Sequence, residues 1–347
     1  MKHNNKKLSS TKFFAILAIV LFFNIMVLNV AIAQGNEADF FKGKTMTFIV
    51  PYSPGGGFDT YSRFIAPFLE KYISGLTVVV NNMPGAGSVI GTNELYKANA
   101  DGLTIGIVNV PTALYAQVGG SPGVRYDLGK FSWLTRVTAE AQVFATGSKT
   151  GINNLEDLKN TDKTLKIGVT GTGSDDHLTS EILFKALGLS MTAIAGYEGS
   201  AEVMLAILRG EVDGYLSSLS SVEQLIETKE MIPIIQIVED EEGILEGVPR
   251  AVDTVDDASA KGLMVSITNI FALDRSLAAP PEMPEGRLEF LRNTLFDIMH
   301  DPEFLEICNK AKRPVDPLKG SSVEKLIDDA LEEADLLSTI LKDIYTF

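Results

Sequence analysis

The chain has 347 residues, a length that suggests one large or two medium domains with enough chain to bury a sizeable core. Its formal net charge of -15 makes nucleic acid and anionic membrane surfaces poor partners. Cys308 is the single cysteine, which excludes an intramolecular disulfide. It stands among apolar neighbours in a helix-like stretch, so we expect it in the core.

The first 33 residues have the pattern of a secretory leader. Four lysines precede an apolar stretch from Phe13 to Val30, and Ala31-Ile32-Ala33 fits the small-x-small rule of signal peptidase. This predicts a signal peptide over 1–33, a mature start at Gln34 and a periplasmic protein that is not a lipoprotein, since no lipobox cysteine follows the leader. An uncleaved anchor is the alternative, because the stretch approaches the length that spans a bilayer. No later apolar run is as long, which excludes a transporter channel.

A glycine loop joins an apolar, strand-like run (Thr45 to Val50) to an amphipathic helix. The loop reads Pro51-Tyr52-Ser53-Pro54-Gly55-Gly56-Gly57-Phe58-Asp59-Thr60, and Asp59 or Thr60 is placed to cap the helix. Three glycines permit positive φ and a close approach of a ligand to main-chain N–H groups. These groups and the helix dipole predict an anion site. No Gly-Lys-Ser/Thr follows, so a small carboxylate suits the loop better than a nucleotide; a tight turn without a ligand is the alternative.

Strands and helices alternate along the chain, which predicts a parallel α/β sheet. Further strands are expected at Leu76 to Val80, Leu103 to Val108, twice between Phe131 and Ala145, and at Leu165 to Val169, Ile232 to Val238 and within Gly262 to Leu273. Further helices are expected at Val89 to Ala98, Asp176 to Leu187, Ala201 to Arg209, Glu285 to His300, Pro302 to Lys312 and Ser321 to Ile344. We expect the chain to cross between two lobes near residues 138 and 238.

Other strand ends repeat the features of the first glycine loop. Gly171-Thr172-Gly173-Ser174 lies between a strand and a helix, and Pro111 and Thr112 follow a strand end, where open α/β sheets bind ligands. Two glycine loops facing each other across a cleft would offer N–H donors to a dicarboxylate, or to one carboxylate held from both sides. Hydroxyls at Ser53, Thr112, Thr172 and Ser174 would add hydrogen bonds, unless they serve only as caps or in turns.

A hydrolytic enzyme is the rival class. Ser174, Asp175, Asp176 and His177 are too close along a turn and a helix start to converge as a triad, and there is no Gly-x-Ser-x-Gly elbow. Metal ligation lacks a His/Cys cluster; the aspartates could hold calcium, but helix capping explains them more simply. We therefore expect no catalytic residue, no metal and no cofactor.

Five motifs resemble, in order, those of the Bug (TctC-like) solute-binding proteins of tripartite tricarboxylate transporters. They are Pro51 to Asp59 with Arg63, Asn82-Met83-Pro84-Gly85-Ala86-Gly87, Asp101-Gly102-Leu103-Thr104, Gly171 to Ser174 with His177, and Tyr197-Glu198-Gly199-Ser200 through Gly210-Glu211-Val212-Asp213. The resemblance implies a two-lobed periplasmic binding protein of the type II-like α/β class, with a mixed sheet flanked by helices in each lobe and a ligand cleft between them. Lobe 1 is expected from 34–138 and 239–347, and lobe 2 from 139–238.

The resemblance also implies that the protein closes on a small mono-, di- or tricarboxylate and delivers it, as a monomer, to a permease with one large and one small membrane subunit. The ligand-binding residues it implies, together with the loops above, are Tyr52, Ser53, Pro54, Gly55, Gly56, Gly57, Asp59, Pro111, Thr112, Gly171, Thr172, Gly173, Ser174, His177, Tyr197 and Ser217. A sensory protein that presents its ligand to a membrane receptor would use the same cleft. Amino-acid-binding members carry an aspartate suited to an ammonium group where this chain has Ser217, which argues against an amino-acid ligand.

Overall fold

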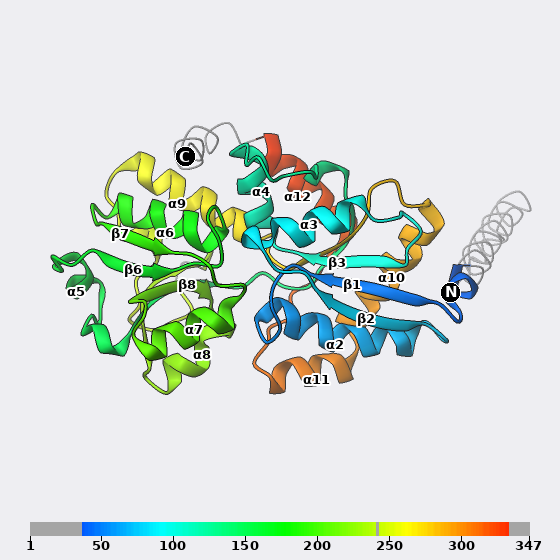
Figure 1. The fold of residues 1–347 in the computed structure, drawn as a ribbon, viewed down its shortest axis with the longest axis horizontal. Helices are drawn as coiled ribbons and strands as arrows, with labels where there is room; N and C mark the ends of the chain where they lie inside the picture. The colour runs from blue at the N-terminus through cyan, green and yellow to red at the C-terminus, as the bar shows by residue number, and fades with distance from the viewer. Residues whose placement is uncertain (1–36, 241–242, 333–347) are drawn as a thin grey trace, which may run out of the picture.

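Two β-sheets, each flanked by helices, make up the part of the chain that the computed structural model describes, residues 37–240 and 243–332 (Figure 1). We call the part built around the six-stranded sheet lobe 1 and the part built around the five-stranded sheet lobe 2. Both sheets combine parallel and antiparallel pairs. The predicted α/β class, with a mixed sheet in each lobe, is confirmed.

Successive side chains along the strands of the lobe 1 sheet point alternately into two buried clusters, one on each face. Its strands, in spatial order, are β11 (Leu318–Lys319), β4 (Ser132–Arg136), β10 (Ser276–Ala279), β3 (Thr104–Val108), β1 (Thr45–Val50) and β2 (Thr77–Asn82). In β1, Phe48 and Val50 enter one buried cluster whereas Ile49 enters the other, as the two-residue period of a strand requires. Both faces of this sheet are therefore covered, and the apolar run that predicted β1 is explained by burial on both sides.

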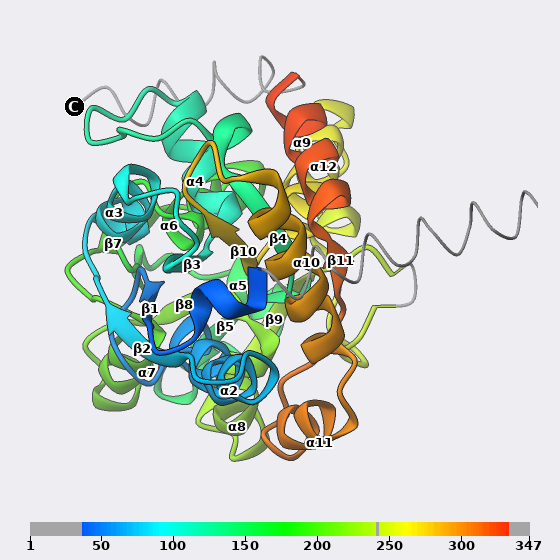
Figure 2. The same ribbon diagram turned by 90° about the vertical axis from the view of Figure 1, so that its right-hand side faces the viewer.

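Helices cover both faces of the lobe 1 sheet. One face carries α2 (Gly57–Tyr72), α10 (Glu285–Met299) and α11 (Pro302–Lys310), and the other carries α3 (Val89–Lys97), α4 (Val110–Val118) and α12 (Gly320–Glu332). Figure 2 shows α2 and α11 on one side of β1 and β2, and α3 and α4 on the other. Cys308 of α11 is fully buried, which confirms its predicted place in the core. Val323 and Ile327 are buried too and hold α12 against lobe 1.

Lobe 2 repeats this arrangement with five strands. They lie in the order β7 (Met191–Ile194), β6 (Leu165–Gly168), β8 (Gly214–Ser218), β5 (Gln142–Gly147) and β9 (Met231–Ile237). The helices α5 (Leu155–Lys159), α6 (Asp175–Ala186) and α9 (Ala258–Phe271) pack on one face, and α7 (Ser200–Arg209) and α8 (Leu219–Glu227) on the other. Each of β6 and β8 ends at a junction with a helix, which brings loops of lobe 2 toward lobe 1 (Figure 1).

The strands predicted within Gly262 to Leu273 are wrong, because this segment belongs to helix α9. Its β-branched and apolar residues are typical of a strand, but Met264, Ile267 and Phe271 are buried at helical spacing. Asp257 caps the helix by accepting a hydrogen bond from the Ala260 N–H group.

The chain passes from one sheet to the other twice within the described residues. The first passage lies between β4 and β5. After β9 the chain continues into α9, which packs with the buried residues of lobe 2, and it rejoins the lobe 1 sheet at β10. The division of the chain at residues 138 and 238 stays a prediction. The second passage in the structure falls between Phe271 and Ser276.

Several predictions concern residues outside the described ranges. They are the leader over 1–33, the mature start at Gln34 and the end of the last predicted helix beyond Glu332. Within the described ranges, no helix combines the length and the apolar character needed to span a membrane.

Candidate functional site

A cavity between the two lobes collects side chains from several strand-to-helix junctions. It is lined by Tyr52, Gly56, Gly57, Phe58, Asn109, Gln142, Thr170, Asp175, Asp176, Ser200, Tyr215, Leu216, Ser217, Ser218, Ser221, Asp274 and Arg275. Its free volume of about 40 Å³ holds about three water molecules.

Two helices begin at this cavity with a glycine as N-cap. Gly56 precedes α2 and Gly199 precedes α7, and glycine has no side chain with which to cap the first turn. The first N–H groups of a helix otherwise lack partners, and the helix dipole places partial positive charge there. Gly57 and Ser200, the first residues of the two helices, both line the cavity. The cavity is therefore suited to an anion at this wall.

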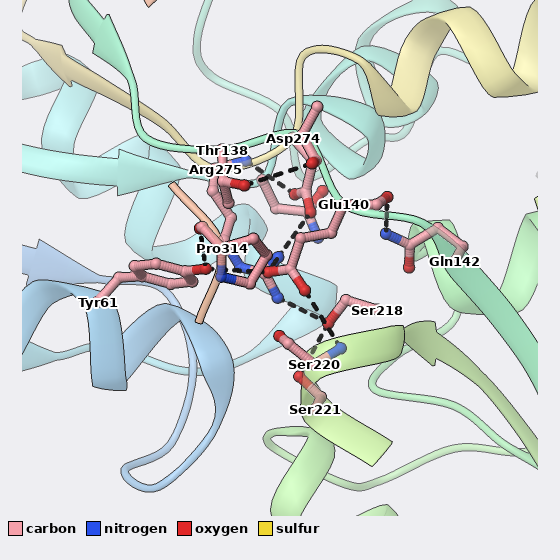
Figure 3. Close-up of polar contacts among 12 residues, drawn as sticks. Tyr61, Thr138, Glu140, Gln142, Ser218, Ser220, Ser221, Asp274, Arg275 and Pro314 are labelled. Carbon is pink, nitrogen blue, oxygen red and sulfur yellow. Dashed lines mark hydrogen bonds and ion pairs between the residues drawn. The ribbon is translucent and has the colours of Figure 1, made fainter. Parts of the chain in front are cut away.

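Arg275 lines the cavity, and we call Arg275, Asp274 and Glu140 together the charged base of the cavity; Figure 3 shows the polar contacts among them. Its side chain is 3% exposed, and its guanidinium group donates to Glu140, to Asp274 Oδ2 at 3.2 Å and to Ser218 Oγ at 2.8 Å. Tyr61 of α2 donates to Glu140 Oε1 at 3.3 Å and to the Pro314 carbonyl at 2.6 Å. This network joins α2 of lobe 1 to β8 of lobe 2.

Charges in this network are held far from water. Burial alone would lower the pKa of Arg275, but the carboxylates of Glu140 and Asp274 raise it above its usual value. Burial raises the pKa of Asp274 to about 7, although Arg275 acts in the opposite direction. Arg275 therefore remains charged, and Asp274 takes up a proton far more readily than an exposed aspartate does.

Two more carboxylates lie at the start of α6. Asp175 Oδ1 accepts hydrogen bonds from Thr112 Oγ1 at 2.7 Å and from Asn109 Nδ2 at 3.1 Å, and both donors belong to lobe 1. Asp176 accepts from the Thr170 N–H group at 2.8 Å and from the Ser174 hydroxyl. Burial raises the pKa of both carboxyl groups; with the adjacent Asp175 charge, it brings the pKa of Asp176 to about 7.

Close backbone contacts also join the lobes beside the cavity. The Ser53 N–H group donates to the Glu198 carbonyl at 2.9 Å. A Cβ atom on Gly171 would lie 2.5 Å from the Gly87 nitrogen, a distance that real side chains do not reach. Glycine at position 171 thus allows the second glycine loop to lie directly against the Asn82-to-Ser88 loop of lobe 1.

Four of the residues predicted to bind the ligand line the cavity: Tyr52, Gly56, Gly57 and Ser217. Thr112 lies next to it through its contact with Asp175, and Pro111 is buried in the first turn of α4. The other predicted residues do not line the cavity: Ser53, Pro54, Gly55, Asp59, Gly171, Thr172, Gly173, Ser174, His177 and Tyr197. Whether any of them contacts a ligand stays a prediction.

Two of these residues, Asp59 and His177, use their side chains within the loops. Asp59 Oδ2 accepts from the Gly55 N–H group at 2.9 Å and from Arg63 Nε at 2.9 Å. Burial alone would raise the pKa of Asp59, but hydrogen bonds from Arg63, Gly55 and Asn82 lower it. His177 Nδ1 accepts from the Gly173 N–H group at 3.0 Å, and burial lowers the pKa of this histidine, so it is neutral. The histidine therefore orders the second glycine loop.

Sequence reasoning missed the charged base of the cavity. Arg275, Asp274 and Glu140 belong to no motif, and no local sequence pattern marks them. Asn109 offers a faint signal, since it ends a strand and caps α4 by accepting from the Thr112 N–H group at 3.0 Å. Across 37–240 and 243–332, no group of three His, Cys, Asp or Glu side chains is arranged to hold a metal ion.

Comparisons with known proteins agree with this architecture. A family model described as tripartite tricarboxylate transporter family receptor (TctC) matches residues 62–342. The chain is 26% identical over 281 residues to a UPF0065 protein in the TAR-I ttuE-ttuC' intergenic region of Agrobacterium vitis, which covers 79% of this chain and 76% of that protein.

Two solved structures are similar to the whole described fold. The periplasmic binding protein BugD matches with a TM-score of 0.72 and 22% identity, over 87% of this chain and 97% of that one. MatC from Rhodopseudomonas palustris with bound malate matches with a TM-score of 0.70 and 18% identity, over 87% and 99%. These similarities show a periplasmic binding protein fold.

Proposed function

Because the chain belongs to the tripartite tricarboxylate transporter receptor family, whose members bind ligands and are not enzymes, we propose that it captures a small organic carboxylate in the cavity between its lobes. It then delivers this ligand in the periplasm to a transporter with one large and one small membrane subunit. The malate bound to MatC supports a carboxylate as the ligand class.

The observation that carries this proposal is the arrangement of positive groups around the cavity. The N-termini of α2 and α7 meet it with glycine caps, and Arg275 lies at its base. Main-chain N–H groups at a helix start and a guanidinium group are both suited to the oxygens of a carboxylate. The groups come from both lobes, so a bound carboxylate would stabilise the closed arrangement.

A thermal-shift screen of the purified protein tests this function. The panel contains mono-, di- and tricarboxylates, amino acids, sugars and phosphate esters. A ligand that binds only the folded state at about 100 times its dissociation constant adds about 2.7 kcal/mol to the free energy of unfolding. We expect at least one carboxylate, with or without an amino group, to raise the melting temperature, and sugars to leave it unchanged.

A variant at the start of α2 links the shift to the cavity. A Cβ atom on Gly57 would lie 2.6 Å from Arg275 Nη2 and 3.2 Å from Ser221 Oγ, so Gly57→Ala narrows the cavity where the anion is expected. Gly262→Ala is the matched control, because a Cβ atom there meets nothing within 4 Å. Gly57→Ala should lose the carboxylate shift while Gly262→Ala keeps it. A shift with sugars or phosphate esters alone would contradict the proposed function.

A further inference from the structure

Two carboxylates on the cavity wall, those of Asp175 and Asp176, form no ion pair with a side chain of the described residues. Asp176 is 4% exposed, and in the described part of the chain no side-chain nitrogen of Lys, Arg or His lies within 4.0 Å of its carboxylate or that of Asp175. Their hydrogen bonds come from neutral groups: the hydroxyls of Thr112 and Ser174, the Asn109 amide and main-chain N–H groups. A buried carboxylate normally has a counter-charge, because neutral donors compensate only part of its lost hydration.

The side chain of Arg275, which lines the same cavity, also carries a donor without an acceptor. Arg275 Nε is buried and has no hydrogen-bond partner among the residues that the structure describes. The other guanidinium nitrogens are used by Glu140, Asp274 and Ser218. A buried N–H group left unpaired costs free energy, so this atom marks a place for an acceptor that the described chain does not supply. The cavity thus combines a region suited to an anion with a region suited to a cation.

We propose, building on the function proposed above, that the ligand is an amino carboxylate, a zwitterion whose carboxylate faces Arg275 and the N-terminus of α2 and whose ammonium group faces Asp175 and Asp176. Tyr52 and Tyr215 line the same cavity, and the faces of their rings also attract a cation. One ligand of this class supplies both groups that the cavity lacks.

Charge balance favours this class over a simple dicarboxylate. Asp175, Asp176 and Asp274 line the cavity, and the fourth acid, Glu140, lies behind them as the ion-pair partner of Arg275. Arg275 is the one basic side chain among the lining residues. A dicarboxylate would add two negative charges to this set. An amino acid with the same carbon skeleton adds one fewer net negative charge and places a positive charge beside two of the four acids.

This proposal departs from the expectation drawn from Ser217. Ser217 lines the cavity and carries no charge. The carboxylates that would meet an ammonium group are instead those of Asp175 and Asp176, at the start of α6. The loop that was expected to supply main-chain donors also supplies Asp175 and Asp176. The two Oδ atoms of Asp176 already accept hydrogen bonds from the N–H groups of Thr170 and His177, which leaves fewer donors of this loop for a ligand anion.

Matched ligand pairs test the proposal directly. Each pair has the same carbon skeleton with and without an amino group: alanine and propionate, aspartate and succinate, glutamate and glutarate. Dissociation constants are measured by isothermal titration calorimetry at about pH 8, where most carboxyl groups of the protein are ionised. In the pair whose length fits the cavity, we expect the amino acid to bind at least about tenfold more tightly than its partner.

Two isosteric variants identify the groups responsible. Asp175→Asn and Asp176→Asn each remove a charge from the cavity while keeping the size of the side chain, and each should reduce the preference about tenfold. Glu181→Gln is the matched control, because it removes a charge from the same helix without lining the cavity. It should leave the preference unchanged. If one aspartate variant does not fold, the proposal is tested by the ligand preference of the unmodified protein and by that of the other variant.

The outcomes separate this proposal from the function on which it rests. A deaminated acid that binds as tightly as its amino acid, or a preference that both aspartate variants retain, overturns the amino-carboxylate class and leaves the carboxylate-binding function standing. Failure of every carboxylate in the wider screen to bind overturns both.

Discussion

Replacing Arg275 with methionine should strongly destabilise the protein even without a ligand. Methionine keeps the apolar stem beside the rings of Phe58 and Tyr61, which lie 5.0 Å and 5.4 Å from the guanidinium carbon. It removes the charge on which Glu140 and Asp274 depend. The experiment therefore measures the cost of leaving two buried carboxyl groups without their cation.

The size of the effect follows from burial. The side chains of Arg275, Glu140 and Asp274 are 3%, 2% and 5% exposed. Removing one partner of so deeply buried an ion pair costs about 3–5 kcal/mol, whereas an exposed pair contributes about 0–1 kcal/mol. We expect Arg275→Met to lower the free energy of unfolding by about 3–5 kcal/mol at neutral pH.

Urea unfolding followed by circular dichroism measures this loss. Arg209→Met is the control, since Arg209 is 67% exposed and lies 3.7 Å from Glu211, so its loss should stay below about 1 kcal/mol. Adding Glu140→Gln to Arg275→Met removes one of the stranded charges and should recover part of the stability. A loss below about 1 kcal/mol for Arg275→Met, or a double variant no more stable than the single one, would refute the reasoning.

Two further predictions concern closure and pH. Gly171→Ala should weaken ligand binding at least about tenfold in calorimetry without unfolding the protein. The Cβ atom of the new alanine would meet the Gly87 nitrogen at 2.5 Å, and this clash arises only when the lobes close. An unchanged affinity would contradict this prediction. The free energy of unfolding of the unliganded protein, measured in urea, should be about 1 kcal/mol higher at pH 6.5 than at pH 8. Asp176 and Asp274 have a pKa of about 7 in the folded protein, against about 3.9 in the unfolded chain. The folded state therefore binds more protons in this range, and its stability falls as the pH rises. His177, whose pKa burial lowers, opposes this trend only as the pH falls through about 6.5, and Asp176→Asn should flatten the slope.

Local patterns predicted most of the elements around the cavity. The junctions after β1 and β6 were recognised because three glycines in one case and Gly171-Thr172-Gly173 in the other separate an apolar run from a helical pattern. These features depend on residues close together in the chain. Helix α6 starts at Asp175, one residue before its predicted start. Helix α2 starts at Gly57 with Gly56 as its N-cap, so the expected cap at Asp59 or Thr60 is wrong.

The charged base of the cavity is not predictable in this way. Arg275 meets Glu140 across 135 positions of the chain and Ser218 across 57, and neither partner lies in a recognisable motif. Such contacts are decided by how the two passages between the lobes pack together. Helix α9 shows the same limit: its composition suits a strand, and only the burial of every third or fourth residue against lobe 2 makes it a helix.

Closure of the lobes and selection of the ligand involve the same atoms. Asp175 lies in lobe 2, yet its hydrogen bonds to Thr112 and Asn109 exist only when lobe 1 is in contact with it. Closure buries this carboxylate, and burial makes its charge costly unless a cation or a proton accompanies it. A ligand that brings an ammonium group to Asp175 would lower the cost of closing, whereas a simple dicarboxylate would raise it. The proposed preference for an amino carboxylate should therefore arise chiefly in the closed state, as a slower dissociation of the amino acid rather than a faster association.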